Sequence, residues 1–410
     1  MTNLIERLRG HLTPAAAVAL AACERICRER DVSLFLVGGA VRDLLLERPT
    51  VDLDLAVEAE AAPIARALAA ATSGRAVLHA RFGTASVSGA GFRLDLAQTR
   101  RETYAHPGAL PSVEPATIAE DLARRDFTVN AMALRLAPVA GELVDPYRGL
   151  ADLRGRRMRV LHERSFQDDA TRMLRALRYA ARLGFKVSRG TEALIRRDLR
   201  YLDTISGARL RRELALLFEE KGAVAGTRQA ARLGVLAAVH PALRLGSATA
   251  ERWTAALTRH HFAPLDELGF CVVADPQDEA TVASLSARLH LTGRREAALF
   301  EFVRLRGLSA KLAAARQSPA AAADLLDGKT PAAVWALATL AGGAAGETCL
   351  AYLEEWRHVR PHLSGHDLLA LGVPPGAAVG EMLQRLRRAR LEGGTRTRAD
   401  EVELVRRGAV

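Results

Sequence analysis

The chain has 410 residues, 49% of them hydrophobic and 26% charged, and a formal net charge of +11 at pH 7. Length and composition exclude a disordered chain and leave room for roughly two to four domains. No apolar run reaches the roughly 20 residues of a membrane-spanning helix, and the first ten residues are too charged for a secretory signal. We therefore expect a cytoplasmic protein with no membrane partner.

The cysteines and the charge distribution narrow the class further. Four cysteines without a ligand pattern favour buried free thiols over a metal site. Residues 151–220 contain 17 Lys and Arg against 10 Asp and Glu, so +7 of the net charge lies in this segment. Such a segment is typical of a surface that binds a phosphate backbone. A solvated helix surface is the alternative.

The first predicted elements surround a glycine pair. Residues 33–37 (SLFLV) form a short apolar run, which predicts a buried strand, and Gly38 and Gly39 follow it. Residues 40–46 predict a helix whose first turn favours anions, with Arg42 placed to add a bidentate phosphate contact. The pattern predicts a triphosphate-binding turn; a tight turn of purely structural role is the alternative.

A pair of carboxylates follows in VDLD, at Asp52 and Asp54. Side chains alternate along a strand, so both carboxylates project from one face, about 7 Å apart, while Leu53 and Leu55 turn to the core. This arrangement can hold magnesium beside a nucleotide. A surface-exposed DxD is the alternative.

The remainder of the first third mixes helix and strand patterns, as in an α/β domain. We predict a helix at residues 61–71 and strands at residues 76–81, 84–88 and 92–97. Asp95, on the last of these strands, is a candidate third carboxylate or an edge residue. Residues 98–115 carry prolines without periodicity and predict a functional loop.

Two helical segments complete the candidate site. Residues 121–136 begin charged and become amphipathic, which predicts a helix carrying Arg125 toward the pocket. Residues 165–185 place Asp169, Arg172, Arg175 and Arg178 three apart, on one ridge of a helix. Aspartate accepts from the exocyclic amines of cytosine and adenine, and arginine donates to ring acceptors, so this pair would select CTP and ATP. An intrahelical salt bridge is the alternative. Beyond residue 146, proline- and glycine-punctuated helical patterns predict an all-α extension.

These segments together resemble a known family. The motifs VGGAVRD, VDLD, DLARRDFTVNAMA, LVDPYRGLADL and FQDDATRMLRALRYAARLGF stand in the order and spacing of class II CCA-adding enzymes, which are tRNA nucleotidyltransferases, and of the similar bacterial poly(A) polymerases. The resemblance covers about residues 33–213. The chain departs from it at Asp168, where the family usually has glutamate.

The resemblance implies an α+β, polymerase β-like nucleotidyltransferase head with a mixed sheet, followed by all-α neck, body and tail domains that bind tRNA. The expected boundaries are residues 1–150, 151–235, 236–345 and 346–410. It further implies Mg²⁺ on Asp52 and Asp54 as the catalytic pair. The implied nucleotide-binding residues are Gly38, Gly39, Arg42, Arg125, Asp169, Arg172, Arg175 and Arg178.

The implied activity is addition of CCA, or part of it, to the 3′ end of tRNA from CTP and ATP, with release of pyrophosphate. A poly(A) polymerase that extends RNA with ATP is the enzymatic alternative. An RNA-binding protein on a non-catalytic version of the scaffold is the alternative of another class, which the intact carboxylates and glycines disfavour. The sequence gives no sign of a protein partner.

Overall fold

A computed structural model describes residues 4–49, 53–79, 83–103, 105, 106, 108 and 111–408. The chain divides into two compact units. Unit 1 comprises residues 1–205 and 233–235, and unit 2 comprises residues 206–232 and 236–410. The finer division into head, neck, body and tail stays a prediction.

Unit 1 is built on a mixed sheet, as predicted for the head. Its strand order is β3-β4-β5-β2-β1-β8-β9. Strands β2 and β5 run parallel, and the other neighbours run antiparallel. The strands are β1 (Leu34–Val37), β2 (Leu53–Val57), β3 (Arg75–His79), β4 (Thr84–Gly89), β5 (Phe92–Gln98), β8 (Ala133–Ala137) and β9 (Leu143–Val144).

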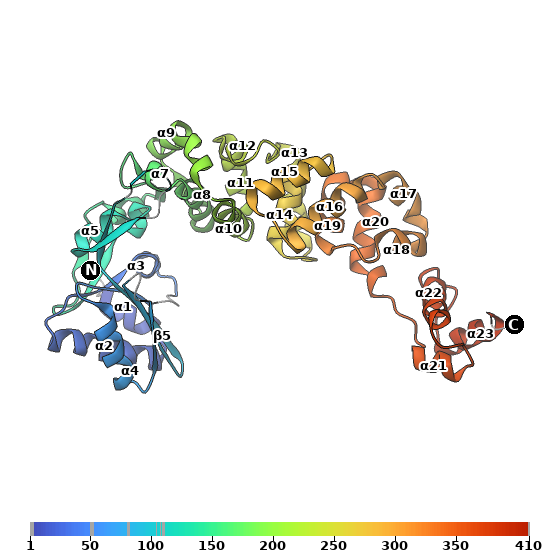
Figure 1. Ribbon diagram of the computed structural model, residues 1–410, viewed down its shortest axis with the longest axis horizontal. Coiled ribbons are helices and arrows are strands. Elements are labelled where there is room, and N and C mark those ends of the chain that lie inside the picture. Colours follow the sequence, from blue (N-terminus) through green and yellow to red (C-terminus); the bar gives the residue numbers. More distant parts are fainter. Residues whose placement is uncertain are drawn as a thin grey trace. The chain divides into compact units, whose positions relative to one another are not determined.

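Helices cover this sheet and connect its strands (Figure 1). These are α1 (Leu4–His11), α2 (Pro14–Glu29), α3 (Gly39–Leu45) and α4 (Ala61–Ala71). Helices α2 and α4 contact each other and the strands β5 and β4, so they share one face of the sheet. All four residues of β1 are buried, which explains its uninterrupted apolar sequence.

Most local predictions for this region are confirmed. The helix expected at residues 61–71 has these bounds in the structure, and the strand pair and its neighbour are β3, β4 and β5. Arg81, at the end of the predicted first strand of that pair, lies outside the described residues. All four cysteines are free and buried, as expected.

The prediction of one helix over residues 121–136 is wrong. Helix α5 (Ile118–Ala123) ends there, a 3-10 turn η2 (Thr128–Asn130) follows, and the apolar remainder is strand β8. Phe127 is extended, with φ −135° and ψ 149°. Strand β8 pairs on both edges and is almost wholly buried, so it lacks the alternation that marks an exposed strand.

The prediction of an irregular loop at residues 98–115 is also wrong in part. Strands β6 (Arg100–Thr103) and β7 (Ser112–Pro115) pair antiparallel as a separate ribbon. The N–H of Thr99 donates to the carbonyl of Val57 at 2.9 Å, and the N–H of Ala116 donates to the carbonyl of Thr99 at 3.1 Å. The first bond fixes the base of the ribbon to β2 of the sheet, and the second closes the ribbon at its base.

The helical part of unit 1 follows the sheet. It contains α6 (Gly149–Arg154), β10 (Arg157–Met158), α7 (Ser165–Asp168), α8 (Thr171–Leu183), β11 (Lys186–Val187), α9 (Arg189–Asp198) and η3 (Leu199–Thr204). Helix α8 buries Met173, Leu174 and Leu177 and ends at Gly184, whose φ of +70° suits glycine.

Helices are the only regular elements among the described residues of unit 2, as predicted for the extension, from green α10 to red α23 in Figure 1. The rings of Trp253 and Phe270 meet Phe218 edge-on in its core. The helices are α10 (Gly207–Phe218), α11 (Ala223–Arg232), α12 (Val235–Val239) at the boundary, α13 (Ser247–Arg259), α14 (Leu265–Ala274), α15 (Glu279–Leu289), α16 (Arg294–Arg306), α17 (Ser309–Ala314), η4 (Ala315–Gln317), α18 (Pro319–Leu326), α19 (Pro331–Ala341), α20 (Gly343–Glu354), η5 (Trp356–His358), α21 (Gly365–Ala370), α22 (Ala377–Leu391) and α23 (Arg398–Gly408). None of the helices in the described part of the chain is long and apolar enough to cross a membrane.

Candidate active site

The glycine pair joins β1 to α3: Gly38 is the N-cap and Gly39 the first residue of the helix. Gly38 has φ +69° and ψ −129°, a conformation that disfavours any residue with a Cβ. A Cβ there would lie 2.7 Å from Nη1 of Arg125, and one on Gly39 would lie 3.4 Å from Nη2 of Arg42. The absence of side chains therefore allows two guanidinium groups to approach this turn closely.

Arg42 is buried beneath the turn and held from two sides. Its Nε and Nη2 donate to the carboxylate of Asp43 at 2.9 and 2.8 Å. Its Nη1 donates to Oδ1 of Asn130 at 2.7 Å. Asn130 in turn donates from Nδ2 to Asp126 at 3.1 Å. The orientation of Arg42 is therefore fixed by groups on α3 and η2.

The carboxylates of the sheet come next. Asp54 is the exposed residue of β2, between the buried Leu53 and Leu55, as predicted. Asp52 lies outside the described residues. Asp95 on β5 is the direct neighbour of Asp54 in the parallel pair, so the two side chains leave the same face. The carboxylate of Asp95 accepts from the hydroxyl of Ser86 and from Arg93.

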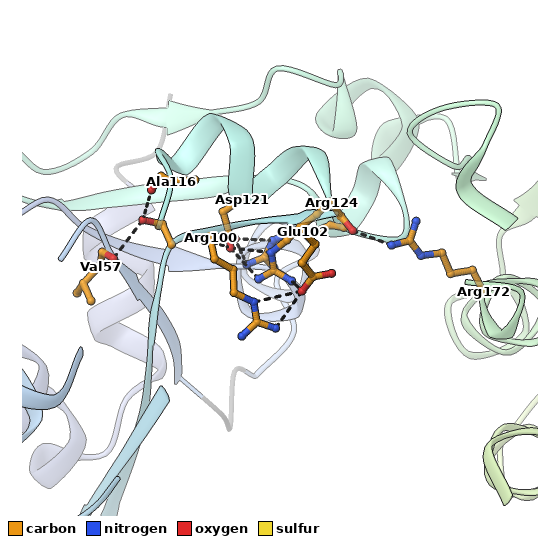
Figure 2. Close-up of polar contacts among 9 residues, drawn as sticks. Val57, Arg100, Glu102, Ala116, Asp121, Arg124 and Arg172 are labelled. Atoms are coloured by element: carbon orange, nitrogen blue, oxygen red, sulfur yellow. Dashed lines mark hydrogen bonds and ion pairs between the residues drawn. The ribbon is translucent and has the colours of Figure 1, made fainter. Parts of the chain in front are cut away.

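Arg124 and Arg125 follow helix α5 and share one buried carboxylate, that of Asp121 (Figure 2 labels Arg124 and Asp121). Their distances to it are 2.7 and 3.0 Å. Burial alone would raise the pKa of Asp121, but Arg125 and Arg124 hold it below its ordinary value. Asp121 therefore stays ionised and keeps both arginines in place.

Glu102 of the β6–β7 ribbon contacts the same group of arginines. Its Oε1 accepts from Arg124 at 2.9 Å and from Arg100 at 3.0 Å, as Figure 2 shows. The ribbon that was predicted as a functional loop therefore reaches the candidate site through Glu102.

Arg172 of α8 is 6% exposed and firmly held. Its Nη1 donates to Oγ of Ser165 at 3.0 Å, and its Nη2 donates to the carbonyl of Arg124 at 2.7 Å (Figure 2). Asp169 precedes the helix: its backbone is extended, and its Oδ1 accepts from the N–H and hydroxyl of Thr171. The prediction that Asp169 lies on the helical ridge is therefore wrong, because its carboxylate caps the start of α8.

Arg175 pairs with a second buried aspartate, Asp126. Its Nη2 lies 2.6 Å from Oδ2 of Asp126, whose Oδ1 accepts from the N–H of Phe127. Burial would raise the pKa of Asp126, but Arg175, with help from Asn130, lowers it. This ion pair connects α8 to the segment between α5 and η2.

These side chains meet around a cavity of about 740 Å³ within unit 1. The predicted residues that line it are Gly38, Gly39, Arg42, Asp54, Arg125, Asp169, Arg172 and Arg175. Arg178 is buried beside it, with Cζ 4.6 Å from the ring centre of Tyr179. Lining residues that the sequence analysis missed are Ala40, Asp43, Pro49, Glu102, Arg124, Asp126, Asn130, Tyr179 and Arg182. Helical spacing from Arg175 could have indicated Tyr179 and Arg182.

Comparisons with known proteins agree with this geometry. Residues 34–159 match the family described as "Poly A polymerase head domain", and residues 184–245 match "Probable RNA and SrmB- binding site of polymerase A". An A-adding tRNA nucleotidyltransferase of Geobacter sulfurreducens is 32% identical over 98% of this chain. The chain spans about half of that relative, 48% of its length. A CC-adding tRNA nucleotidyltransferase of Deinococcus radiodurans is 35% identical over 90% of this chain and 88% of its own.

Solved structures similar to this chain include CCA-adding enzymes. The structure titled "The structure of CCA-adding enzyme apo form II" has a TM-score of 0.85 and 26% identity, covering 99% of both chains. The Thermotoga maritima CCA-adding enzyme complexed with tRNA has a TM-score of 0.82 and 26% identity, covering 100% of this chain and 99% of its own. The chain therefore belongs to the tRNA nucleotidyltransferase family, the class II CCA-adding enzymes and their relatives.

Proposed function

We propose that this protein adds CCA, or part of it, to the 3′ end of tRNA, using CTP and ATP and releasing pyrophosphate. One observation carries the proposal: a single cavity combines Asp54, the Gly38–Gly39 turn, the arginines that directly follow α5 and those on α8. The relatives include A-adding and CC-adding enzymes, so the proposal covers addition of CC alone, of the final A alone, or of all three nucleotides.

We assign the triphosphate to the arginines around the glycine turn. Arg42 and Arg125 are fixed by Asp43, Asn130 and Asp121, so donors are oriented before the nucleotide arrives. A fixed guanidinium loses little conformational entropy on binding phosphate. These residues would position the α-phosphate beside Asp54.

The carboxylates fit Mg²⁺. Among the described residues no group of three His, Cys, Asp or Glu side chains could hold a metal by itself. Magnesium is usually bound by one or two carboxylates together with substrate phosphates and water, and Asp54 is an exposed carboxylate in the cavity lining. We assign its binding to Asp54 together with Asp52. When bound, Mg²⁺ lowers the pKa of the attacking hydroxyl and offsets charge on the triphosphate.

We assign the choice of base to Asp169 and Arg172, which line the same cavity. Asp169 would accept from an exocyclic amine, and Arg172 would donate to a ring acceptor. The bonds from Arg172 to Ser165 and to the Arg124 carbonyl fix the direction of its guanidinium. A base with a carbonyl in place of the amine offers no donor to the Asp169 carboxylate, which would then stay unpaired. The cost of this unpaired carboxylate would favour CTP and ATP over UTP and GTP.

A poly(A) polymerase remains the second candidate, because the head matches the poly(A) polymerase head domain. Both candidates are tested by incubating the purified protein with tRNA ending before CCA, after CC, and complete, with CTP and ATP separately and together. Addition of at most three nucleotides supports the proposal, and a long adenylate tail supports the polymerase. Asp54→Ala should abolish incorporation while tRNA binding persists; no pyrophosphate release by the wild type would favour a protein that only binds RNA.

A further inference from the structure

One aromatic ring in the cavity contacts an unusual number of cations. Four guanidinium carbons lie within 6 Å of the ring centre of Tyr179. The distances are 4.6 Å for Arg178, 5.4 Å for Arg175, 5.6 Å for Arg182 and 5.7 Å for Arg42. A significant contact of this kind occurs about once per 70–80 residues of protein, so four on one ring indicate a specific arrangement.

The helix explains how three of them meet. Arg175 and Arg182 stand one turn before and one turn after Tyr179 on α8, and Arg178 is its immediate neighbour. Arg42 comes from α3, which follows the glycine turn. The ring of Tyr179 therefore contacts both Arg42, which we assign to the triphosphate, and the arginines of α8.

The ring holds these cations differently from the carboxylates of the site. Asp43 and Asp126 pair with Arg42 and Arg175 and offset their charge. An aromatic face attracts a cation through its quadrupole without adding a negative charge, and this attraction uses none of the N–H donors of the guanidinium. Tyr179 can thus keep mutually repelling arginines together and leave the cluster cationic. The rings of Phe127 and Tyr179 meet edge-on, with centres 6.0 Å apart, so a second aromatic ring packs against Tyr179.

We propose that Tyr179 is a positioning residue that aligns Arg42, Arg175 and Arg182, which line the cavity with it, to receive the triphosphate of the incoming nucleotide. Arg178, which lies outside the lining, supports the ring from the same helix. This proposal rests on the proposed function, because it assigns the triphosphate to this cavity. It predicts that the aromatic ring matters and that the hydroxyl does not. It also predicts that the effect is the same for CTP and ATP, since the triphosphate is common to both.

The test compares Tyr179→Leu with Tyr179→Phe. Loss of the ring in Tyr179→Leu should raise KM for both nucleotides roughly tenfold, with KM for tRNA unchanged. Tyr179→Phe should stay within about threefold of the wild type, because it keeps the ring. The matched control is Tyr201→Leu. The ring centre of Tyr201 also lies close to a guanidinium, 5.0 Å from Cζ of Arg200, but Tyr201 is not among the residues that line the cavity. It should leave every kinetic constant unchanged.

Binding of inorganic tripolyphosphate, measured by calorimetry, separates this proposal from the proposed function. The Tyr179→Leu variant should lose about as much affinity for tripolyphosphate as for the nucleotides. If it loses nucleotide affinity but keeps tripolyphosphate affinity, the ring stacks on the base and the proposal is wrong. Unchanged binding of both also overturns it. If the wild type binds tripolyphosphate but extends no tRNA, the proposed function is wrong. The role of the ring is then decided by the difference in tripolyphosphate affinity between Tyr179→Leu and the wild type.

Discussion

Substitution of Gly38 by alanine tests how the glycine turn serves nucleotide binding. The backbone of Gly38, at φ +69° and ψ −129°, strains any residue with a Cβ, at a cost of about 1–3 kcal/mol. The new Cβ would also lie 2.7 Å from Nη1 of Arg125, so that guanidinium must move. The contact is with the far end of the Arg125 side chain, and Arg124 still pairs with Asp121 when that end moves, so the displacement adds little to the folding cost. It does change the position of the Arg125 guanidinium relative to Asp121 and the cavity.

Gly293 provides a matched control. It stands at the same position before a helix, α16, with φ +63° and ψ −133°, and a Cβ there meets nothing within 4 Å. Gly293→Ala and Gly38→Ala should therefore lose similar free energies of unfolding, each about 1–3 kcal/mol. Displacing Arg125 in Gly38→Ala should also remove one charged hydrogen bond to phosphate, about 1.5–3 kcal/mol, which raises KM for CTP or ATP about 10- to 150-fold.

Urea denaturation gives the stability of both variants, and steady-state incorporation into tRNA gives KM for each nucleotide. The reasoning requires a similar stability loss but a rise in nucleotide KM in Gly38→Ala alone. If Gly293→Ala raised KM as much, the effect would come from general destabilisation. If Gly38→Ala kept the wild-type KM, Arg125 would have no part in nucleotide binding.

Three further predictions concern Ser165, which binds Arg172, the candidate base contact Asp169, and the buried carboxylates that pair with arginines. Ser165→Ala removes one acceptor from Arg172 and should lower the preference for CTP over UTP and for ATP over GTP by roughly tenfold, with Ser165→Thr as the conservative comparison, both measured by competitive incorporation. Asp169→Ala should reduce the same preference but leave KM for tRNA unchanged, and undiminished selection would favour a purely capping role. Folding lowers the pKa values of Asp121 and Asp126, so the stabilisation that these carboxylates provide is present above about pH 4 and is lost as the pH falls through their folded pKa values. The variant Asp126→Asn lacks one of these groups. Urea titrations should therefore show a smaller loss of its free energy of unfolding between about pH 6 and pH 3 than in the wild type.

The sequence alone predicted the secondary structure correctly where the residues that determine it are neighbours in the chain. An apolar run, two glycines and a following helix lie within about a dozen residues, and the structure has β1, Gly38 and α3 in these positions. Helix α4 was predicted to the residue for the same reason. Short-range patterns of this kind need no information about the rest of the fold.

The prediction failed where distant parts of the chain decide the structure. Strand β8 has helix-like composition, but pairing on both edges within the sheet makes it a strand. Arg42 and Asn130 are 88 positions apart, so no local pattern could reveal their hydrogen bond. Asp169 differs: its carboxylate bonds Thr171 two residues on, and this capping pattern could have indicated that α8 begins after it.

The charges of the cavity show that orientation contributes more to this site than net charge. Among the described residues that line it, six arginines face five carboxylates. A nearly balanced lining gives only weak long-range attraction, which salt screens further. Several arginines bind a carboxylate through some of their donors, and these bonds fix the direction in which the remaining donors point. Asp43, Asp121 and Asp126 therefore contribute to nucleotide binding through geometry, although each reduces the positive charge that a triphosphate meets.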